Sequence, residues 1–575
     1  MARRLQFILL GLLAGGAFWQ LSELPFAWQQ TWSFAAVAVL ALSFFGGALG
    51  MLGSLGARRA LLSALAIAVP AAGLTLLCAR RFADVEQMVS SAHIAAALMA
   101  VTALPVPFAV ALAKHGRSGW KNYACLFTES WNLVVRYAAA WLFVAVLWLV
   151  LWLLWLLLAL VGIEAVGDFL TRTPVVWLIS GAATGLALAV VTELSDMISP
   201  YLLLRLLRLL LPLVLVVEVV FVAVLPASGL MRLFGYISPA GILLVTAMAS
   251  ILLVTIAVDQ DDAEAAQGRV LTWSARGLAL LLPVLALLAG WALALRVDAY
   301  GWTPSRVGMA TMVVLIGGYA LCYAGAVLCG TRWRGILRWS NIAMALVTVA
   351  VGALWLTPVL SAEGLAVRSQ LARYDQGRIG ADQLPVWEFA NEWGRPGERA
   401  LTHLRAQAQQ PGQEGLAQRL AVLDGARNRG DTTTALPGTA RAQDLRQVIA
   451  TLPEGTDLPE ALMMAIARGS EADWVSGCMQ RTAAGHPGCL VVLGDFDPQR
   501  PGRDALFVRQ QGFDTVLAFQ ERGHRWIGAR PVFLGDGPAL SGGALIDALT
   551  AGGGATAPAA LRALPLGDRQ LTILP

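Results

Sequence analysis

The chain has 575 residues, of which 57% are hydrophobic and only 14% are charged. Soluble domains are typically about 45–50% apolar and about 25% charged, so this composition excludes an ordinary soluble protein. The isoelectric point lies near 9.0, but it requires no nucleic-acid partner, because basic residues also flank membrane spans and set their orientation. We therefore expect the lipid bilayer as the main partner of this chain and no nucleic acid.

Apolar blocks of roughly 18–25 residues, the length an α-helix needs to cross a bilayer, fill the chain as far as residue 360. We interpret the first block as a span and not as a cleaved signal peptide, because no A-x-A-like site follows it. The stretch 200–212 is also compatible with an interfacial helix. The eleven predicted spans lie near residues 5–22, 32–53, 60–78, 92–113, 134–161, 175–195, 209–225, 239–258, 277–295, 307–329 and 341–360.

The arginines and lysines of the short loops predict the orientation of these spans. One set of alternating loops carries fourteen of them and the opposite set carries six. Because cytoplasmic loops carry the excess of basic residues, the N-terminus is expected in the cytoplasm. An odd number of spans then places the C-terminal region on the other side of the membrane.

The region after residue 360 is polar and punctuated by Pro and Gly, which predicts a soluble α+β domain. Amphipathic helices are expected within 361–470, interrupted by a flexible stretch at 428–440. The period becomes strand-like from residue 489, and ERG at 521–523 is a plausible hairpin turn. The predicted organisation is therefore a transmembrane domain over 1–360, a helical segment over 361–470 and a β-rich segment over 471–575.

Two cysteines of this soluble region, Cys478 and Cys489, flank a short Gly- and Pro-containing loop. They are expected to form a disulfide, which persists only in an oxidising compartment such as the periplasm. Two unrelated buried thiols, or a metal pair completed by His486, are the alternatives. Asp495, Asp497 and Asp504 superficially resemble a calcium loop, but the inserted Pro-Gln-Arg-Pro breaks the spacing, so a strand–turn–strand edge is favoured and no metal is expected.

Glu218 is the main intramembrane polar candidate, because apolar residues flank it on both sides. A carboxylate at that depth costs at least about 2.5 kcal/mol, so Glu218 is expected to face the protein interior, either protonated or hydrogen-bonded. The acidic stretch 259–264 (DQDDAE) follows the eighth span and is expected to be a solvated loop.

The connector Arg296 to Val307, RVDAYGWTPSRV, separates the ninth and tenth predicted spans. It resembles the arginine and Tyr-Gly-x-Thr-x-x-Arg signature of a bacterial membrane family, domain of unknown function 4153. Further stretches follow in that family's order: LRLLLPLVLVVEVVF, LPASGLMRLFGYISPAGILLV, AVRSQLARYDQGRI and NEWGRPGERAL. The resemblance covers about 200 to 410 and implies a multi-pass protein of the bacterial inner membrane, without an activity. Glu218 departs from the pattern, because its span is usually apolar or aromatic there.

The connector also has a structural interpretation. Gly301 permits a tight reversal, while Thr303 followed by Pro304 is typical of a helix N-cap and first helical position. Tyr300 and Trp302 suit the headgroup region of a bilayer.

The charges of the connector leave two interpretations open. Arg296 and Arg306 would pair with Asp298 or with lipid phosphate in a purely structural role. Alternatively, the two arginines bind a ligand.

No sequence motif supports enzyme chemistry or a cofactor, since P-loop, G-x-S-x-G, H-E-x-x-H and paired CxxC patterns are lacking. The leading hypothesis is an envelope scaffold or sensor whose periplasmic C-terminal domain binds another envelope protein or a cell-wall component. The second is a secondary transporter or channel that uses Glu218. The third is a membrane-embedded enzyme of envelope polymer or lipid assembly, for which Glu23, Glu164 and Asp168 are modest candidates.

Overall fold

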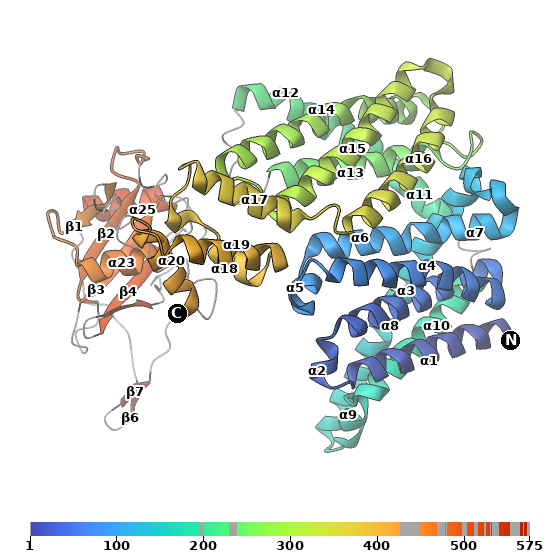
Figure 1. Cartoon of the computed structure of the whole chain (residues 1–575), viewed down its shortest axis with the longest axis horizontal. Helices are drawn as coiled ribbons and strands as arrows, with labels where there is room; N and C mark the ends of the chain where they lie inside the picture. The colour runs from blue at the N-terminus through green and yellow to red at the C-terminus, as the bar shows by residue number, and fades with distance from the viewer. Residues whose placement is uncertain are drawn as a thin grey trace. The chain divides into compact units, whose positions relative to one another are not determined.

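The computed structural model divides the chain into two compact units, one rich in long helices and one containing a small sheet (Figure 1). The first comprises Met1–Ile379 with Glu388–Leu404, and the second comprises Gly380–Trp387 with Arg405–Pro575. The first unit therefore continues past residue 360. The structure describes residues 2–194, 200–228, 239–425, 446, 448–468, 478, 480–496, 503–510, 516–522, 525–529, 531, 540–552, 564–566 and 569–571.

Eleven helical segments in the described part of the chain are long and apolar enough to cross a membrane. This number agrees with the predicted spans and confirms a polytopic α-helical membrane protein. They are formed by α1 (Ala2–Ser22), α3 (Trp32–Leu55), α4 (Ala57–Ala79), α6 (Ala92–Ala103) with α7 (Pro105–His115), α8 (Tyr123–Leu160), α10 (Thr173–Leu194), α11 (Pro200–Arg208) with α12 (Leu210–Ser228), α13 (Pro239–Val258), α14 (Arg269–Tyr300), α15 (Pro304–Leu328) and α16 (Trp333–Trp355).

Short helices join these segments or follow them. They are α2 (Phe26–Gln29), α5 (Val85–Val89), η1 (Gly116–Lys121), α9 (Ala165–Leu170), η3 (Gly330–Arg332), α17 (Ala362–Asp375), η4 (Ala381–Gln383), α18 (Val386–Asn391), α19 (Gly394–Gln407) and α20 (Glu414–Gly425). Helices α17 to α20 correspond to the amphipathic segments expected after the last span.

Helix α8 begins at Tyr123, well before the predicted start at 134. Its first turn is capped by Asn122, whose side chain accepts a hydrogen bond from the Cys125 amide at 3.1 Å. The carboxylate of Glu129, inside this extension, accepts from Lys114 at 2.6 Å. The extension was missed because its charged residues interrupt the apolar run, although their partners within the protein let the helix continue.

Helices α1 and α10 pack with their backbones in close contact at small residues. A Cβ atom built on Gly11 would lie 2.2 Å from the Gly181 carbonyl oxygen, and one on Gly181 would lie 2.3 Å from the Gly11 carbonyl oxygen. A Cβ atom on Gly185 would likewise lie 2.3 Å from the Phe7 carbonyl oxygen. The small-residue spacings of these two helices therefore serve packing within the bundle.

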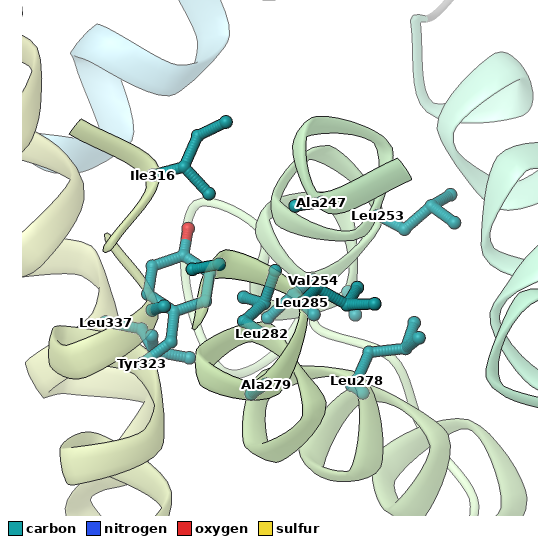
Figure 2. Packing of buried hydrophobic residues seen from close by; sticks show 14 of the residues in the cluster. Ala247, Leu253, Val254, Leu278, Ala279, Leu282, Leu285, Ile316, Tyr323 and Leu337 are labelled. Carbon is teal, nitrogen blue, oxygen red and sulfur yellow. The ribbon is translucent and has the colours of Figure 1, made fainter. Parts of the chain in front are cut away.

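The largest apolar core of the helical unit lies among α13, α14, α15 and α16. Figure 2 shows Leu282 and Leu285 of α14 gathered with Val254 of α13 beside the ring of Tyr323. All four side chains are fully buried. This packing fixes the relative positions of the helices that end at the turns described below.

The acidic stretch after α13 is exposed at Asp261 and Asp262, as expected of a solvated loop, but not at Asp259. Asp259 is fully buried and forms an ion pair with Arg208. Its carbonyl oxygen accepts from Arg338 at 3.2 Å, and the same arginine reaches Asp262 at 2.9 Å. Asp259 is buried because two arginines from distant helices converge on it, which the composition of the stretch alone does not indicate.

The second unit contains a five-stranded sheet in the order β1-β2-β3-β4-β5, with β1 parallel to β2 and the other neighbours antiparallel. Arg522 pairs with Arg525 in the β4–β5 register, as the predicted hairpin requires. The predicted stretch 428–440 lies outside the described residues. The elements are β1 (Ala450–Leu452), α23 (Glu460–Arg468), β2 (Cys489–Gly494), β3 (Asp504–Arg509), β4 (Val516–Arg522), β5 (Arg525–Ala529), α25 (Gly542–Ala551), and a β6 (Leu564–Leu566) and β7 (Arg569–Leu571) pair.

Candidate functional site

The candidate site is built around α17, the helix that follows the last membrane-spanning helix. Ser361 caps its N-terminus by accepting a hydrogen bond from the Gly364 amide at 3.0 Å. An acidic residue in the first turn, Glu363, suits the positive end of the helix dipole. Local sequence therefore explains where α17 begins, while the contacts of its side chains explain where it lies.

Glu363 is fully buried and joins α17 to two other elements. One carboxylate oxygen accepts from the guanidinium of Arg81, which follows α4, and the other lies 2.9 Å from Nε2 of His93 in α6. The same arginine donates to the Trp355 carbonyl oxygen at 2.6 Å. These four residues thus connect α17 with the ends of α4, α6 and α16.

The environment of Glu363 keeps its carboxyl group ionised. Burial raises the pKa of Glu363, but the hydrogen bond with His93 and the charge of Arg81 lower it, and the net result is a pKa of about 2 instead of 4.5. A buried carboxylate is tolerable because a cation lies beside it. The cluster is therefore charged and internally paired at neutral pH.

The segment before α19 packs against the same arginine. The Arg395 amide donates to the Arg81 carbonyl oxygen at 3.0 Å. Gly394 has a φ of +56°, and a Cβ atom there would lie 2.4 Å from that oxygen. Glycine is required at this position by both the backbone conformation and the close approach.

The connector of the predicted signature forms the turn between α14 and α15. Gly301 ends α14 with a φ of +74°, and its amide donates to the Val297 carbonyl oxygen at 2.7 Å. Thr303 is the N-cap of α15, with Pro304 at the first helical position. The chain therefore reverses here through an αL glycine and a capped helix start.

One face of α17 binds this turn through side chains. Ser369 accepts from the Trp302 amide at 3.1 Å, and Gln370 donates to the Tyr300 and Trp302 carbonyl oxygens, both at 3.0 Å. Arg373 donates to the carbonyl oxygens of residues 298 and 299, both at 2.7 Å. We call these three residues, together with Arg81, His93 and Glu363, the α17 anchor.

The charged residues of the turn have different environments. Arg306 donates to the Gly301 carbonyl oxygen at 2.6 Å, and its guanidinium lies 5.5 Å from the centre of the Tyr300 ring. Asp298 is exposed. Among the residues that the structure describes, no ion pair joins Asp298 to Arg296 or Arg306.

Glu218 lies in α12, away from the anchor, and is 2% exposed. It accepts a hydrogen bond from the hydroxyl of Ser250 in α13, while its second carboxyl oxygen is buried without a hydrogen-bond partner. The carboxyl group therefore faces the protein interior and has a neutral partner.

A polar network inside the helical unit was not anticipated from the sequence. Tyr323 lies 2.8 Å from the Thr255 hydroxyl and donates to Asn341 at 2.6 Å, and Asn341 donates to Tyr123 at 3.0 Å. Tyr123, Thr255 and Asn341 also line a cavity of about 290 Å³ with mostly apolar walls. The network satisfies the polar groups of α8, α13, α15 and α16 where they meet.

The second unit contributes a disulfide. Cys478 and Cys489 are bonded to each other and are both buried. His486 instead lies 2.8 Å from Asp547, whose pKa is lowered by hydrogen bonds from Thr482 and His486. Within the described ranges no group of three or more His, Cys, Asp or Glu residues is arranged to hold a metal ion.

The remaining acidic candidates lie in other parts of the chain. Glu23, Glu164 and Asp168 are exposed, and Asp504 accepts from the Phe496 amide at 3.1 Å within the sheet unit. Asp497 lies outside the described residues.

Comparisons of the chain with protein-family models, curated proteins and solved structures found no match.

The anchor residues Arg81, His93 and Glu363 were not singled out by sequence reasoning. One signal was present, because Arg81 belongs to the set of loops that carries few basic residues. A basic residue on that side does not contribute to orientation and needs another explanation.

Proposed function

We propose that this multi-pass membrane protein is an envelope scaffold or sensor of the bacterial inner membrane that acts through its C-terminal unit. The observation that supports this proposal most strongly is the α17 anchor. It ties the helix leading out of the membrane bundle to two separate turns, by one buried ion-pair cluster and five hydrogen bonds to the 298–302 backbone. A helix α17 that is fixed to the membrane bundle suits a protein that binds an envelope component with its C-terminal unit.

The periplasmic location of the C-terminal unit is part of this proposal. The excess of basic residues in one set of loops and the disulfide between Cys478 and Cys489 both support it. A C-terminal alkaline phosphatase fusion is expected to be active in cells. An inactive phosphatase fusion with a fluorescent C-terminal green fluorescent protein fusion would place the unit in the cytoplasm and contradict the proposal.

Membership of the family domain of unknown function 4153 is proposed on the ordered motifs. The contacts of the anchor add support, because they join two of these motifs, the 296–307 connector and the Ser-x-Leu-Ala-Arg segment of α17. A shared contact gives the two motifs a physical reason to occur together.

The binding role is tested by photo-crosslinking in cells. A crosslinker at Ile527, an exposed residue of β5, is expected to capture another envelope protein or cell-wall material, whereas one at Leu157, an exposed apolar residue of α8, is expected to capture lipid. Equal capture from both positions, or none from Ile527 and further exposed positions of the second unit, would contradict a scaffold.

A secondary transporter is the alternative that one observation favours, namely the unpartnered second oxygen of Glu218. An intramembrane carboxyl group is a common proton carrier. Proton or solute flux in proteoliposomes that Glu218→Gln eliminates, with folding unchanged, would favour transport over the scaffold. Absence of flux in the wild type would leave the transporter hypothesis without support from Glu218.

A further inference from the structure

Arg306 is held in a fixed position at the turn between α14 and α15. One terminal nitrogen donates to the Gly301 carbonyl oxygen at 2.6 Å, and the guanidinium lies over the ring of Tyr300. The Arg306 side chain makes no other hydrogen bond or ion pair within the described residues. The remaining N–H groups of an oriented guanidinium are therefore available to a ligand.

Arg296 brings a second positive charge to the same place. It lies one helical turn before Tyr300 on α14 and is partly buried, and its side chain forms no hydrogen bond or ion pair in the part of the chain that the structure describes. Residues four apart on a helix lie on the same face, so Arg296 lies beside Tyr300, whose ring also contacts the Arg306 guanidinium. Arg373 binds the carbonyl oxygens of residues 298 and 299 at the same helix end. The nearby carboxylate of Asp298 is exposed and pairs with none of them.

Capping of α14 explains only part of this arrangement. Arg373 and Arg306 donate to carbonyl oxygens at the helix end, where cations stabilise the unsatisfied carbonyl groups. Arg296 contacts no such carbonyl. Its position beside Arg306 therefore lacks an explanation within the protein.

We propose that Arg296 and Arg306 together bind a phosphate group, supplied by an anionic lipid or by a soluble phosphate ester. The planar guanidinium donates paired N–H groups that match phosphate oxygens. The hydroxyls of Thr303 and Ser305, 3.0 Å apart at the start of α15, add polar groups beside the arginines. The turn joins two spans, where the phosphate groups of a bilayer are found. The proposal is independent of the scaffold function.

The test uses the full-length protein in maltoside micelles, which contain no phosphate. In one arm, phosphatidylglycerol is added and the melting temperature followed, with diacylglycerol as the lipid that lacks phosphate. In the other arm, inorganic phosphate is compared with sodium chloride at equal ionic strength, because salt screens surface charge.

Arg296→Gln is the decisive variant, since its side chain makes no contact that the variant would remove. Arg172→Gln, at an exposed arginine outside the helices, is the control. Arg296→Gln is expected to raise the ligand concentration needed for half-maximal stabilisation about tenfold. This factor corresponds to the loss of one charge-assisted hydrogen bond. Arg306→Lys, which retains the charge, checks that the planar donor matters.

The two arms identify the source of the phosphate. Stabilisation by phosphatidylglycerol alone assigns a lipid headgroup, and stabilisation by inorganic phosphate assigns a soluble ligand. No saturable stabilisation in either arm, or stabilisation that Arg296→Gln leaves unchanged, would overturn the proposal.

Discussion

Two of the buried carboxyl groups in the described part of the helical unit have opposite kinds of partner. Glu363, at the edge of the bundle, is bound by Arg81 and His93, whereas Glu218, within a membrane-spanning helix, has only the Ser250 hydroxyl. Both are almost inaccessible to solvent. The first carboxylate is paired with the Arg81 cation from another segment, and the second relies on a neutral neighbour.

This difference indicates what each group does for the structure. Glu363 is separated by 282 residues from Arg81 and by 270 from His93, so its bonds connect distant parts of the chain. Glu218 and Ser250 lie on consecutive helices. We infer that Glu363 connects α17 to segments far away in the chain. Glu218 makes a local packing contact unless the protein transports ions.

The largest effect is expected for Glu363→Gln. The amide keeps the shape of the side chain but leaves Arg81 as a buried charge without a counter-ion, which costs about 3–5 kcal/mol in similar cases. The free energy of unfolding of the purified protein, measured in micelles, should fall by that amount. Glu398→Gln, an exposed position in the 388–404 segment, should change it by less than about 0.5 kcal/mol. Equal effects of the two variants would show that Glu363 does not stabilise the protein through the anchor.

Acid should weaken the anchor in a defined pH range. Because the pKa of Glu363 in the folded protein, about 2, lies below its ordinary value of 4.5, its contribution is complete above pH 4.5 and is lost as the pH falls towards 2. A shift of this size corresponds to roughly 3 kcal/mol. Unfolding experiments across this range should show the loss in the wild type and a smaller loss in Glu363→Gln. The same slope in both proteins would assign the acid sensitivity to other groups.

His93→Ala should have an intermediate effect. It removes one hydrogen bond to the Glu363 carboxylate and the edge-on contact with the Trp355 ring, whose centre lies 5.8 Å away. Loss of a hydrogen bond to a charged group typically costs about 1.5–3 kcal/mol. His93→Gln, which can still donate, should recover part of the stability in thermal unfolding. Failure of glutamine to recover any stability would assign the effect to ring packing alone.

The smallest effect is expected for Glu218→Gln, if the protein is a scaffold. The amide oxygen can still accept from Ser250, so stability should change by less than about 1 kcal/mol. Glu218→Leu should also be tolerated, because the Ser250 hydroxyl lies 3.1 Å from the Thr246 carbonyl oxygen and keeps that acceptor. A loss comparable with that of Glu363→Gln would show that the two carboxyl groups are not different in kind.

The elements of the fold that depend on local sequence were predictable. Apolar blocks gave the spans, the Thr303-Pro304 pair indicated the start of α15, and the ERG turn indicated the β4–β5 hairpin. Strand β1 was missed because it has only three residues and is defined by its parallel pairing with β2.

The contacts of the anchor could not be predicted in the same way. Ser369, Gln370 and Arg373 lie within about one turn of α17, but their hydrogen-bond partners lie some 70 residues earlier in the chain. A single sequence contains no pairing signal between such distant segments. Arg81 was therefore counted only as a loop charge, and Glu363 was not singled out.

Hydrogen exchange of the α17 amides tests most directly whether the anchor fixes this helix to the membrane bundle. Exchange within 362–375 is compared in the wild type, in Glu363→Gln and in the control Glu398→Gln, in micelles at neutral pH. The anchor predicts faster exchange of α17 in Glu363→Gln alone, with α14 unchanged, because loss of this connection frees the helix before the bundle unfolds. Unchanged protection of α17 in Glu363→Gln would contradict the account.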